Sequence, residues 1–325
     1  LGFDKIKSIE PDKVRTKPTL NFFQKHFHLA QRAVASKGYF ETITWSFSDE
    51  KINDKFKESL ETIQIINPIS SDLNVLRNSL YPNLIYYMEK NLNRGFKDQS
   101  LFEIGPVFTS KRPGDQITVI CGLKKQNNDD NKYEKKINLD IFDLKKDLIQ
   151  TLQELGLGKE DILISDKSPS YYHPGVSGSV YSSKNDNLLI AHFGQLHPKI
   201  VDITFGFEIF LENLVNFKTK NKKTKKNLQL SDYQKSDRDF AFLVNKGTNA
   251  QIIVDAILSV DRTLIKNVKI FDVYIGENIP PNKKSIALKI TIQSDKKTLD
   301  ESDLTDISNK IINSVEKQTG AQIRS

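Results

Sequence analysis

Apolar residues recur every three or four positions in three stretches of the chain, which is the spacing of one helix face. The first stretch runs from residue 20 to residue 34, and Gly38 follows it as a helix stop. The other two run from 84 to 92 and from 141 to 155, and a glycine closes each of them. We therefore expect three helices in the first two thirds of the chain.

Alternation of apolar and polar residues, which is typical of strands, appears between these helices. In residues 42–47 it places Ile43, Trp45 and Phe47 on one face and predicts a half-buried strand. Further strand patterns occupy residues 100–108, 117–123, 178–181, 188–193 and 207–211. Because strands outnumber helices and their connections are irregular, we expect a largely antiparallel sheet flanked by helices.

The end of the chain follows a simpler order of elements. Strands are predicted at 238–245, 268–274, 285–293 and 322–324, and helices at 252–260 and 300–319. This βαββαβ order is that of a ferredoxin-like domain, in which both helices cover one face of a four-stranded sheet. The fold class is therefore α+β.

Side-chain alternation assigns the two faces of this second sheet. Ile286, Leu288 and the isoleucines that follow them should face the helices, which leaves Asp272, Tyr274 and Ser285 on the open face. A carboxylate, a phenol ring and a hydroxyl suit unpaired RNA bases, which open sheets commonly bind. The alternative is structural: Asp272 shapes the turn before Gly276, and Tyr274 shields a sheet edge.

Boundaries are marked by composition. A lysine-rich run with few apolar residues, 218–230, predicts a linker, and a weaker boundary lies near prolines 11 and 18. The expected segments are 1–18, the end of an upstream domain; 19–217, a core domain; 218–230, the linker; and 231–325, the ferredoxin-like domain. Because the chain starts without Met, we expect a fragment of a longer protein.

Composition restricts the functional classes. The net charge of +7 indicates either a polyanionic partner or a Lys-rich composition from an AT-rich genome, and the charge alone does not separate them. No apolar run is long enough to span a membrane. The single Cys121 suggests a reducing, cytoplasmic compartment. Neither a metal-ligand set nor a nucleophile–base pair is recognisable, so we expect no metal and no catalytic residue.

Several ordered sequence words resemble a known family. The words at 236–242, 271–276, 283–288, 297–300 and 320–324 are similar to the ferredoxin-fold anticodon-binding domain of phenylalanyl-tRNA synthetases. Upstream words at 38–44, 67–72, 75–77, 91–95, 101–105, 172–175 and 193–198 resemble the β subunit of the bacterial enzyme. The resemblance covers essentially the whole chain.

The resemblance implies that residues 19–217 have a class II synthetase fold without its activity. Class II catalysis needs an Arg that grips the ATP α-phosphate on the strand after the Glu-Ile-Gly word, but Phe108 is followed by Thr-Ser-Lys-Arg. The late segment 203–208 lacks the second, Gly-rich arginine motif. ATP and Mg²⁺ would serve the whole enzyme, and none should bind this portion.

The resemblance also implies partners. A catalytic α subunit would join in an α2β2 assembly, through the 20–34 helix and the strand after it. The last domain would bind the anticodon of tRNA(Phe) through Asp272, Tyr274, Ser285 and Arg324, although Arg324 is also explained as a salt-bridge partner. Val176 stands where the family usually has Arg, which argues against a ligand role for His173.

Two other functions stay open from the sequence. The first is a free-standing RNA-binding paralogue that never meets an α subunit. The second is a single-chain synthetase like the organellar form, against which the missing arginines argue.

Overall fold

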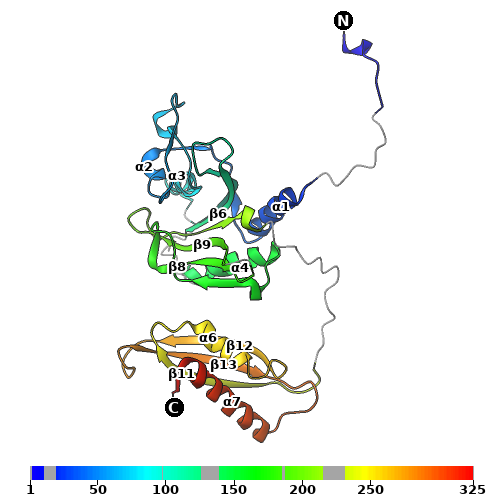
Figure 1. The fold of residues 1–325 in the computed structure, drawn as a ribbon, viewed down its shortest axis with the longest axis vertical. Helices are drawn as coiled ribbons and strands as arrows, with labels where there is room; N and C mark the ends of the chain where they lie inside the picture. The colour runs from blue at the N-terminus through cyan, green and yellow to red at the C-terminus, as the bar shows by residue number, and fades with distance from the viewer. Residues whose placement is uncertain are drawn as a thin grey trace. The chain divides into compact units, whose positions relative to one another are not determined.

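The computed structural model describes residues 2–10, 20–96, 98–125, 139–184, 187–214 and 231–324. They belong to two compact units, residues 1–222 and 223–325, which are described separately (Figure 1). The predicted linker at 218–230 and the predicted boundary near prolines 11 and 18 lie outside the described residues.

A seven-stranded sheet forms the centre of the first unit, in the order β1-β5-β6-β10-β9-β8-β7. Only the β1–β5 pair is parallel, and the other neighbours pair antiparallel, as the sequence predicts. The strands are β1 (Phe40–Glu41), β5 (Gln99–Phe108), β6 (Gln116–Lys125), β7 (Ile162–Ser165), β8 (Tyr172–Ser182), β9 (Leu189–Leu196) and β10 (Phe205–Phe210).

The three predicted helices of this unit are confirmed. They are α1 (Phe22–Ala35), α3 (Tyr81–Leu92) and α4 (Ile141–Glu154). The unit also contains the short helices α2 (Glu50–Asn53) and α5 (Leu211–Leu214). Asn21 begins α1 with a reciprocal capping box to Gln24, and Gly38 follows with φ +87°. A small sheet of β2 (Phe47–Ser48), β4 (Val75–Leu76) and β3 (Ile63–Gln64), with 3-10 turns at Phe3–Lys5, Ser71–Leu73 and Lys159–Asp161, completes the unit.

Both faces of the large sheet are packed. Helices α1 and α4 cover one face, where Phe102, Ile120 and Phe207 are buried. Helix α3 covers the other face together with a cluster of tyrosines. The packing there is tight, because a Cβ at Gly206 would lie 2.7 Å from the Tyr81 ring. The central strands are therefore buried on both sides, as their nearly continuous buried pattern indicates.

A row of polar side chains crosses the sheet on the α3 side. Glu103, Cys121, Glu208 and His192 are successive register partners on β5, β6, β10 and β9. Burial raises the pKa of Glu208 from 4.5 to about 7, although hydrogen bonds from Ser79 and from a tyrosine oppose the shift. Burial also lowers the pKa of His192 from 6.5 to about 4.

The second unit has the predicted βαββαβ order. Its sheet runs β12-β13-β11-β14, all antiparallel, and both helices pack on one face, where Phe242, Ile286, Leu288 and Ile311 are buried. The elements are β11 (Ser236–Asn245), α6 (Ala250–Leu258), β12 (Ile265–Tyr274), β13 (Lys283–Ile292), α7 (Glu301–Thr319) and β14 (Gln322–Ile323).

Two expectations about burial are wrong. The segment 42–47 is not half-buried: only its last residue lies in a strand, and Ile43 and Trp45 are 93% and 60% exposed. The apolar spacing in the predicted helix 252–260 places Ile252 on its inner face with Ile253, Ala256, Ile257 and Val260, but Ile252 lies one position before the buried Ile253 and is 46% exposed.

The pKa of Glu208 gives a testable pH dependence. The folded state holds the proton up to about pH 7, whereas the unfolded chain releases it near pH 4.5, so the stabilising contribution is present below pH 4.5 and lost as pH rises to about 7. Its full size is about 3 kcal/mol at 1.36 kcal/mol per pKa unit. We expect Glu208→Gln to gain free energy of unfolding relative to wild type as pH rises from 5 to 8.

Urea titrations at several pH values measure this difference. His192 titrates in the opposite sense, but it does so in both proteins and cancels in the comparison. A difference between variant and wild type that stays constant from pH 5 to pH 8 would contradict the prediction.

Candidate functional site

The open face of the second sheet is shaped by a β-bulge in β12. Ile270 pairs with Leu288 and Asp272 pairs with Ala287, so Phe271 is an extra residue without a partner. Just before this bulge, Val268 and Ile270 face the helices and pack against the core. After it, the even-numbered Asp272 and Tyr274 face the open side instead.

One cross-strand row on this open face has charges at its ends and methyl groups between them. Asp272 pairs with Ala287, Ala287 pairs with Ala241, and the backbone N–H of Arg324 donates to the Ala241 carbonyl at 2.7 Å. We call these four residues the alanine row. The two alanines leave the sheet low between a carboxylate and a guanidinium, so a flat ring can approach the backbone there.

The neighbouring row places Tyr274 beside Ser285. Tyr274, Ser285 and Leu243 are register partners, and the Tyr274 hydroxyl donates to the Glu277 carbonyl at 3.3 Å. The Arg324 guanidinium lies 5.8 Å from the centre of the Tyr274 ring, within cation–π range. Because these two residues are on opposite edge strands, the Arg324 side chain passes over the middle of the sheet.

A glycine fixes the position of the tyrosine. A Cβ at Gly276 would come within 2.6 Å of the Tyr274 hydroxyl oxygen. The turn after β12 therefore needs glycine there for the ring to lie as it does.

The four predicted site residues are brought to one face, but they are not equally accessible. Asp272 and Arg324 are exposed and Tyr274 is 41% exposed, whereas Ser285 is only 4% exposed. The expectation that Ser285 is displayed to solvent is therefore wrong. Its hydroxyl makes no hydrogen bond to a described residue and stays available only to a ligand that reaches into the sheet.

The structural alternatives for Asp272 and Arg324 find no support among the described residues. Asp272 forms no hydrogen bond or ion pair with any of them, so it does not hold the turn before Gly276. Arg324 forms no ion pair there, and the contact that it makes is with the Tyr274 ring. Both groups keep their charge unneutralised on the open face.

Neither the bulge nor the alanine row was predicted from the sequence. A signal for the bulge was present, because β12 is apolar at Val268 and Ile270 and again at Phe271 and Val273, so its alternation shifts phase by one residue. The alanines gave no signal, because they matter only through the register that aligns them.

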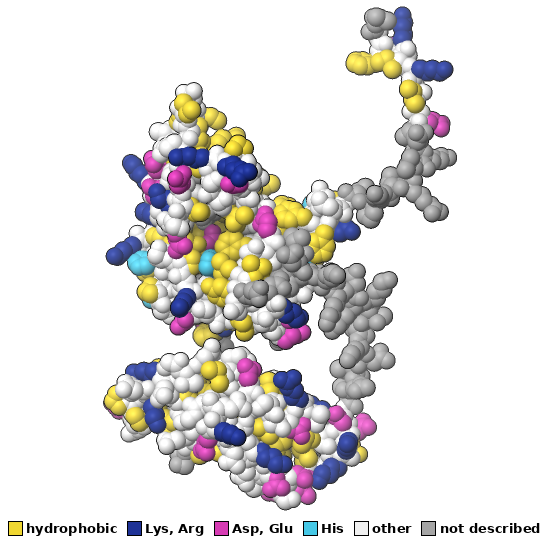
Figure 2. Space-filling model, viewed as in Figure 1, with side chains coloured by type: hydrophobic (Ala, Val, Ile, Leu, Met, Phe, Trp, Pro, Cys, Tyr) yellow, Lys and Arg dark blue, Asp and Glu magenta, His cyan; other side chains and the backbone are white. Residues whose placement is uncertain are grey.

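A second exposed feature lies in the first unit, at the segment 40–47. The backbone of Thr42 donates to the Phe102 carbonyl at 2.7 Å and continues the β1 pairing at the sheet edge. Phe40, Ile43 and Trp45 are exposed, and Figure 2 shows hydrophobic side chains at the surface of this unit. A pocket of about 460 Å³ lies beside them, lined in part by Trp45, Phe47 and Tyr86.

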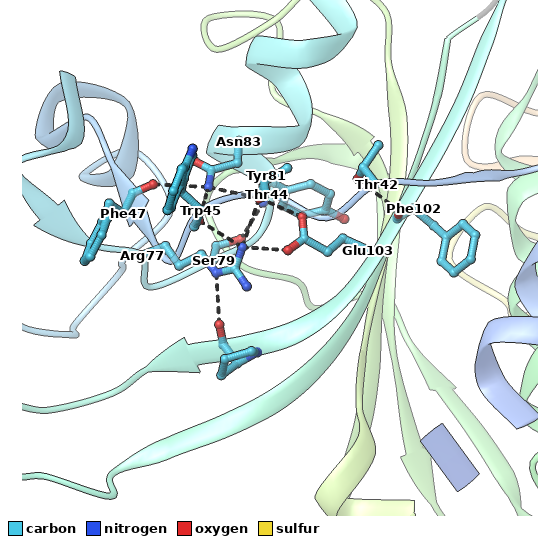
Figure 3. Close-up of polar contacts among 11 residues, drawn as sticks. Thr42, Thr44, Trp45, Phe47, Arg77, Ser79, Tyr81, Asn83, Phe102 and Glu103 are labelled. Carbon is cyan, nitrogen blue, oxygen red and sulfur yellow. Dashed lines mark hydrogen bonds and ion pairs between the residues drawn. The ribbon is translucent and has the colours of Figure 1, made fainter. Parts of the chain in front are cut away.

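A buried ion pair holds this segment in place (Figure 3). The Arg77 guanidinium donates to Glu103 at 2.7 Å and to the Trp45 carbonyl at 3.2 Å, and Thr44 donates to the other Glu103 oxygen. The Asn83 amide donates to the carbonyls of Trp45 and Phe47. The segment is therefore fixed by its backbone while its apolar side chains point outward.

Room for the ion pair comes from the strand β5. Gly105 lies against the guanidinium, and a Cβ there would come within 2.5 Å of Arg77 Nη2. Arg77 and Glu103 are almost fully buried, so water does not reach either charge and each residue neutralises the charge of the other.

In the described ranges, no three His, Cys, Asp or Glu side chains gather closely enough to hold a metal ion. His173 instead accepts a hydrogen bond from the Gly175 backbone. None of the described helices combines the length and apolar character needed to cross a membrane.

Comparisons with known proteins cover both units. A family model described as the phenylalanyl tRNA synthetase beta chain CLM domain matches residues 6–207, and the ferredoxin-fold anticodon binding domain matches residues 231–324. The phenylalanine–tRNA ligase beta subunit of Paramagnetospirillum magneticum is 35% identical over 331 residues, which are 99% of this chain and 41% of that protein.

The subunit of the same name from Rickettsia prowazekii is 36% identical over 98% of this chain and 39% of its own length. The chain thus spans about two fifths of these relatives. A solved pyrrolysyl tRNA synthetase, Desulfitobacterium hafniense PylSc, shares 18% identity with a TM-score of 0.43 and covers 59% of this chain and 64% of its own, too weak a likeness to carry an argument.

The buried ion pair predicts a large effect of Glu103→Ala. Removing the carboxylate leaves the Arg77 charge buried and unpaired, which should lower the free energy of unfolding by about 3–5 kcal/mol. Urea unfolding followed by circular dichroism measures this loss. The fluorescence of Trp45, the single tryptophan of the chain, should change as well because its backbone loses part of its support.

Glu61→Ala is the matched control, because Glu61 pairs with Lys111 at 3.5 Å on the surface. Its effect should stay below about 1 kcal/mol. Equal losses in the two variants would show that the ion pair does not hold the segment.

Proposed function

Because the chain belongs to the phenylalanyl-tRNA synthetase β chain family, we propose that it is a portion of a phenylalanine–tRNA ligase β subunit. The whole enzyme would attach phenylalanine to tRNA(Phe) with ATP and Mg²⁺. In this portion, the second unit would bind the anticodon and the first unit would support a catalytic α subunit.

The unneutralised carboxylate of Asp272 on the open face is the observation that carries the anticodon proposal. The Watson–Crick edge of guanine offers two adjacent N–H donors, and a carboxylate is an acceptor with two oxygens. Guanine in the anticodon would therefore place its edge against Asp272 and its ring over Ala287.

Stacking would supply the rest of the contact. Tyr274 offers an aromatic face, and base stacking on such rings contributes about 1–3 kcal/mol per base. Arg324, which lies against Tyr274, would add a positive charge toward the RNA backbone or a second planar surface. Ser285 is 4% exposed, so its hydroxyl would contact the RNA only if binding moved the neighbouring side chains aside.

The first unit is proposed to bind the α subunit through the segment 40–47 and helix α1. Phe40, Ile43 and Trp45 expose apolar surface that a monomer rarely leaves uncovered. The Arg77 network holds their backbone rigid, so little conformational entropy would be lost on binding.

No catalytic role is proposed for this chain. The segment 109–112 after β5 has no phosphate-gripping Arg at the expected position, and both faces of the central strands are filled. ATP and Mg²⁺ would bind elsewhere in the enzyme. A free-standing paralogue is not favoured, because phenylalanine–tRNA ligase β subunits align with almost the whole of this chain. The compartment proposed is the cytoplasm.

Asp272→Ala tests the anticodon proposal. With the α subunit present, the variant should bind tRNA(Phe) more weakly by about 1–3 kcal/mol, the range of a lost base contact. The loss should shrink when the anticodon guanine is replaced by inosine, which lacks one of the two donors. Filter binding or fluorescence anisotropy measures both.

Asp306→Ala is the control, since Asp306 is exposed on α7, on the helix side of the sheet. Unchanged tRNA binding by Asp272→Ala, with both variants folded, would remove the anticodon role.

Ile43→Ser and Trp45→Ala test the subunit proposal. If these side chains bind the α subunit, each should weaken association at least tenfold, because buried anchors contribute about 2 kcal/mol or more. Analytical ultracentrifugation of the mixture measures this. Ile203→Ser removes an isoleucine elsewhere on the same unit that is 61% exposed, close to the 60% of Trp45, and should have no effect. Equal association of all three variants with α would refute the proposed surface.

A further inference from the structure

The open face of the second sheet continues past the alanine row into a row of charges. Lys269 on β12 is the register partner of Lys289 on β13, and Lys289 is the register partner of Asp239 on β11. We call these three residues the lysine row. It lies two residues along β13 from Ala287, which is about 6.8 Å.

The two lysines face each other directly, an arrangement that the sheet itself does not favour. Side chains opposite each other on neighbouring strands have Cβ atoms about 4.5–5.5 Å apart, and like charges there are destabilising. Asp239 compensates only in part, because its carboxylate is 3.7 Å from the Lys289 amine. Lys269 forms no ion pair with a described residue and is exposed.

Three other cations of the same unit have closer acidic partners than Lys269 and Lys289 have. Arg238 lies 2.7 Å from Glu301 and Lys266 lies 2.9 Å from Asp295, and Lys297 pairs with Asp303. On the face of this unit that is visible in Figure 2, basic and acidic side chains are interspersed. The facing pair of Lys269 and Lys289 is therefore a positive spot that Asp239 compensates only in part.

Acids of the open face lie on both β11 and β12. Asp239 and Asp237 are on β11, and Thr291 on β13 donates to Asp237 at 2.7 Å. Asp272 is on β12, in the alanine row. An anion at the lysine row would therefore lie between the two amines, away from the carboxylates of β11.

We propose that Lys269 and Lys289 together bind a phosphate of the RNA strand whose base occupies the alanine row. This inference rests on the proposed function, because it takes the ligand to be single-stranded RNA. The phosphate would neutralise both amines, while Asp272 would read the base edge. The two rows would thus separate backbone binding from base recognition on one sheet.

Salt dependence distinguishes the two rows. Each phosphate of a single strand that a protein neutralises contributes about 0.7 to the slope of log affinity against log salt concentration. Because the two lysines bind one phosphate, the double variant Lys269→Gln/Lys289→Gln should lower this slope by about 0.7. Wild type should then lose about 2.6-fold more affinity for tRNA(Phe) than the variant between 50 and 200 mM salt.

The experiment uses the full chain with the α subunit and a tRNA(Phe) transcript. Lys317→Gln, on the exposed side of α7, removes one charge without touching the open face and corrects for net charge. Asp272→Ala, measured in the same series, should weaken binding with little change in slope. A synthetic anticodon stem-loop with one neutral methylphosphonate beside the guanine should weaken binding to wild type and not to the double variant.

The outcomes separate the two proposals. If Asp272→Ala weakens binding while the double variant Lys269→Gln/Lys289→Gln changes the slope no more than Lys317→Gln, the phosphate site is wrong and the anticodon proposal stands. If Asp272→Ala leaves affinity unchanged, the proposed function fails, whatever the lysines do. If the methylphosphonate weakens the double variant as much as wild type, another group binds that phosphate.

Discussion

The register between β12 and β13 decides which side chains the second unit presents to solvent, and the extra residue Phe271 sets that register. In a regular strand, the apolar Val268 and Ile270 would commit Asp272 and Tyr274 to the helix side. The carboxylate would then be buried without a partner, at a cost of several kcal/mol or a large pKa shift. One unpaired residue instead lets the same strand supply the core at one end and a polar surface at the other. Bulges recur beside functional sites for this geometric reason.

The first unit meets a comparable problem with a buried charge. Its exposed apolar segment would be loosely held if it depended on its own side chains, because those side chains point into solvent. The structure holds it by the backbone, through Arg77 and Asn83, and uses Glu103 to neutralise the arginine. Such a pair is expensive to break and adds little net stability compared with a packed apolar core. Its effect is on position, because it fixes the backbone of the exposed segment 40–47 in one conformation.

The sequence was sufficient for elements whose pattern is local. Amphipathic spacing predicted α1, α3 and α4, and the order of elements predicted the ferredoxin-like unit. It failed at Ile43 and Trp45, because an exposed segment can show the same alternation as a strand that faces its own core. The position of Asp272 was predicted, but Ser285 was expected to be accessible. Its burial depends on how the strands and their side chains assemble, and no local pattern records that.

The pair Ala241 and Ala287 gives the open face an unusual freedom. A floor of methyl groups does not distinguish one planar ring from another, so in the proposed anticodon role the base preference would come from the acceptor at its rim, Asp272. Exchanging that carboxylate for an amide would then alter the preferred base while the backbone and twist of the sheet stay intact. The sheet would thus supply the platform and one side chain the preference, so that a single point substitution would be enough to change it.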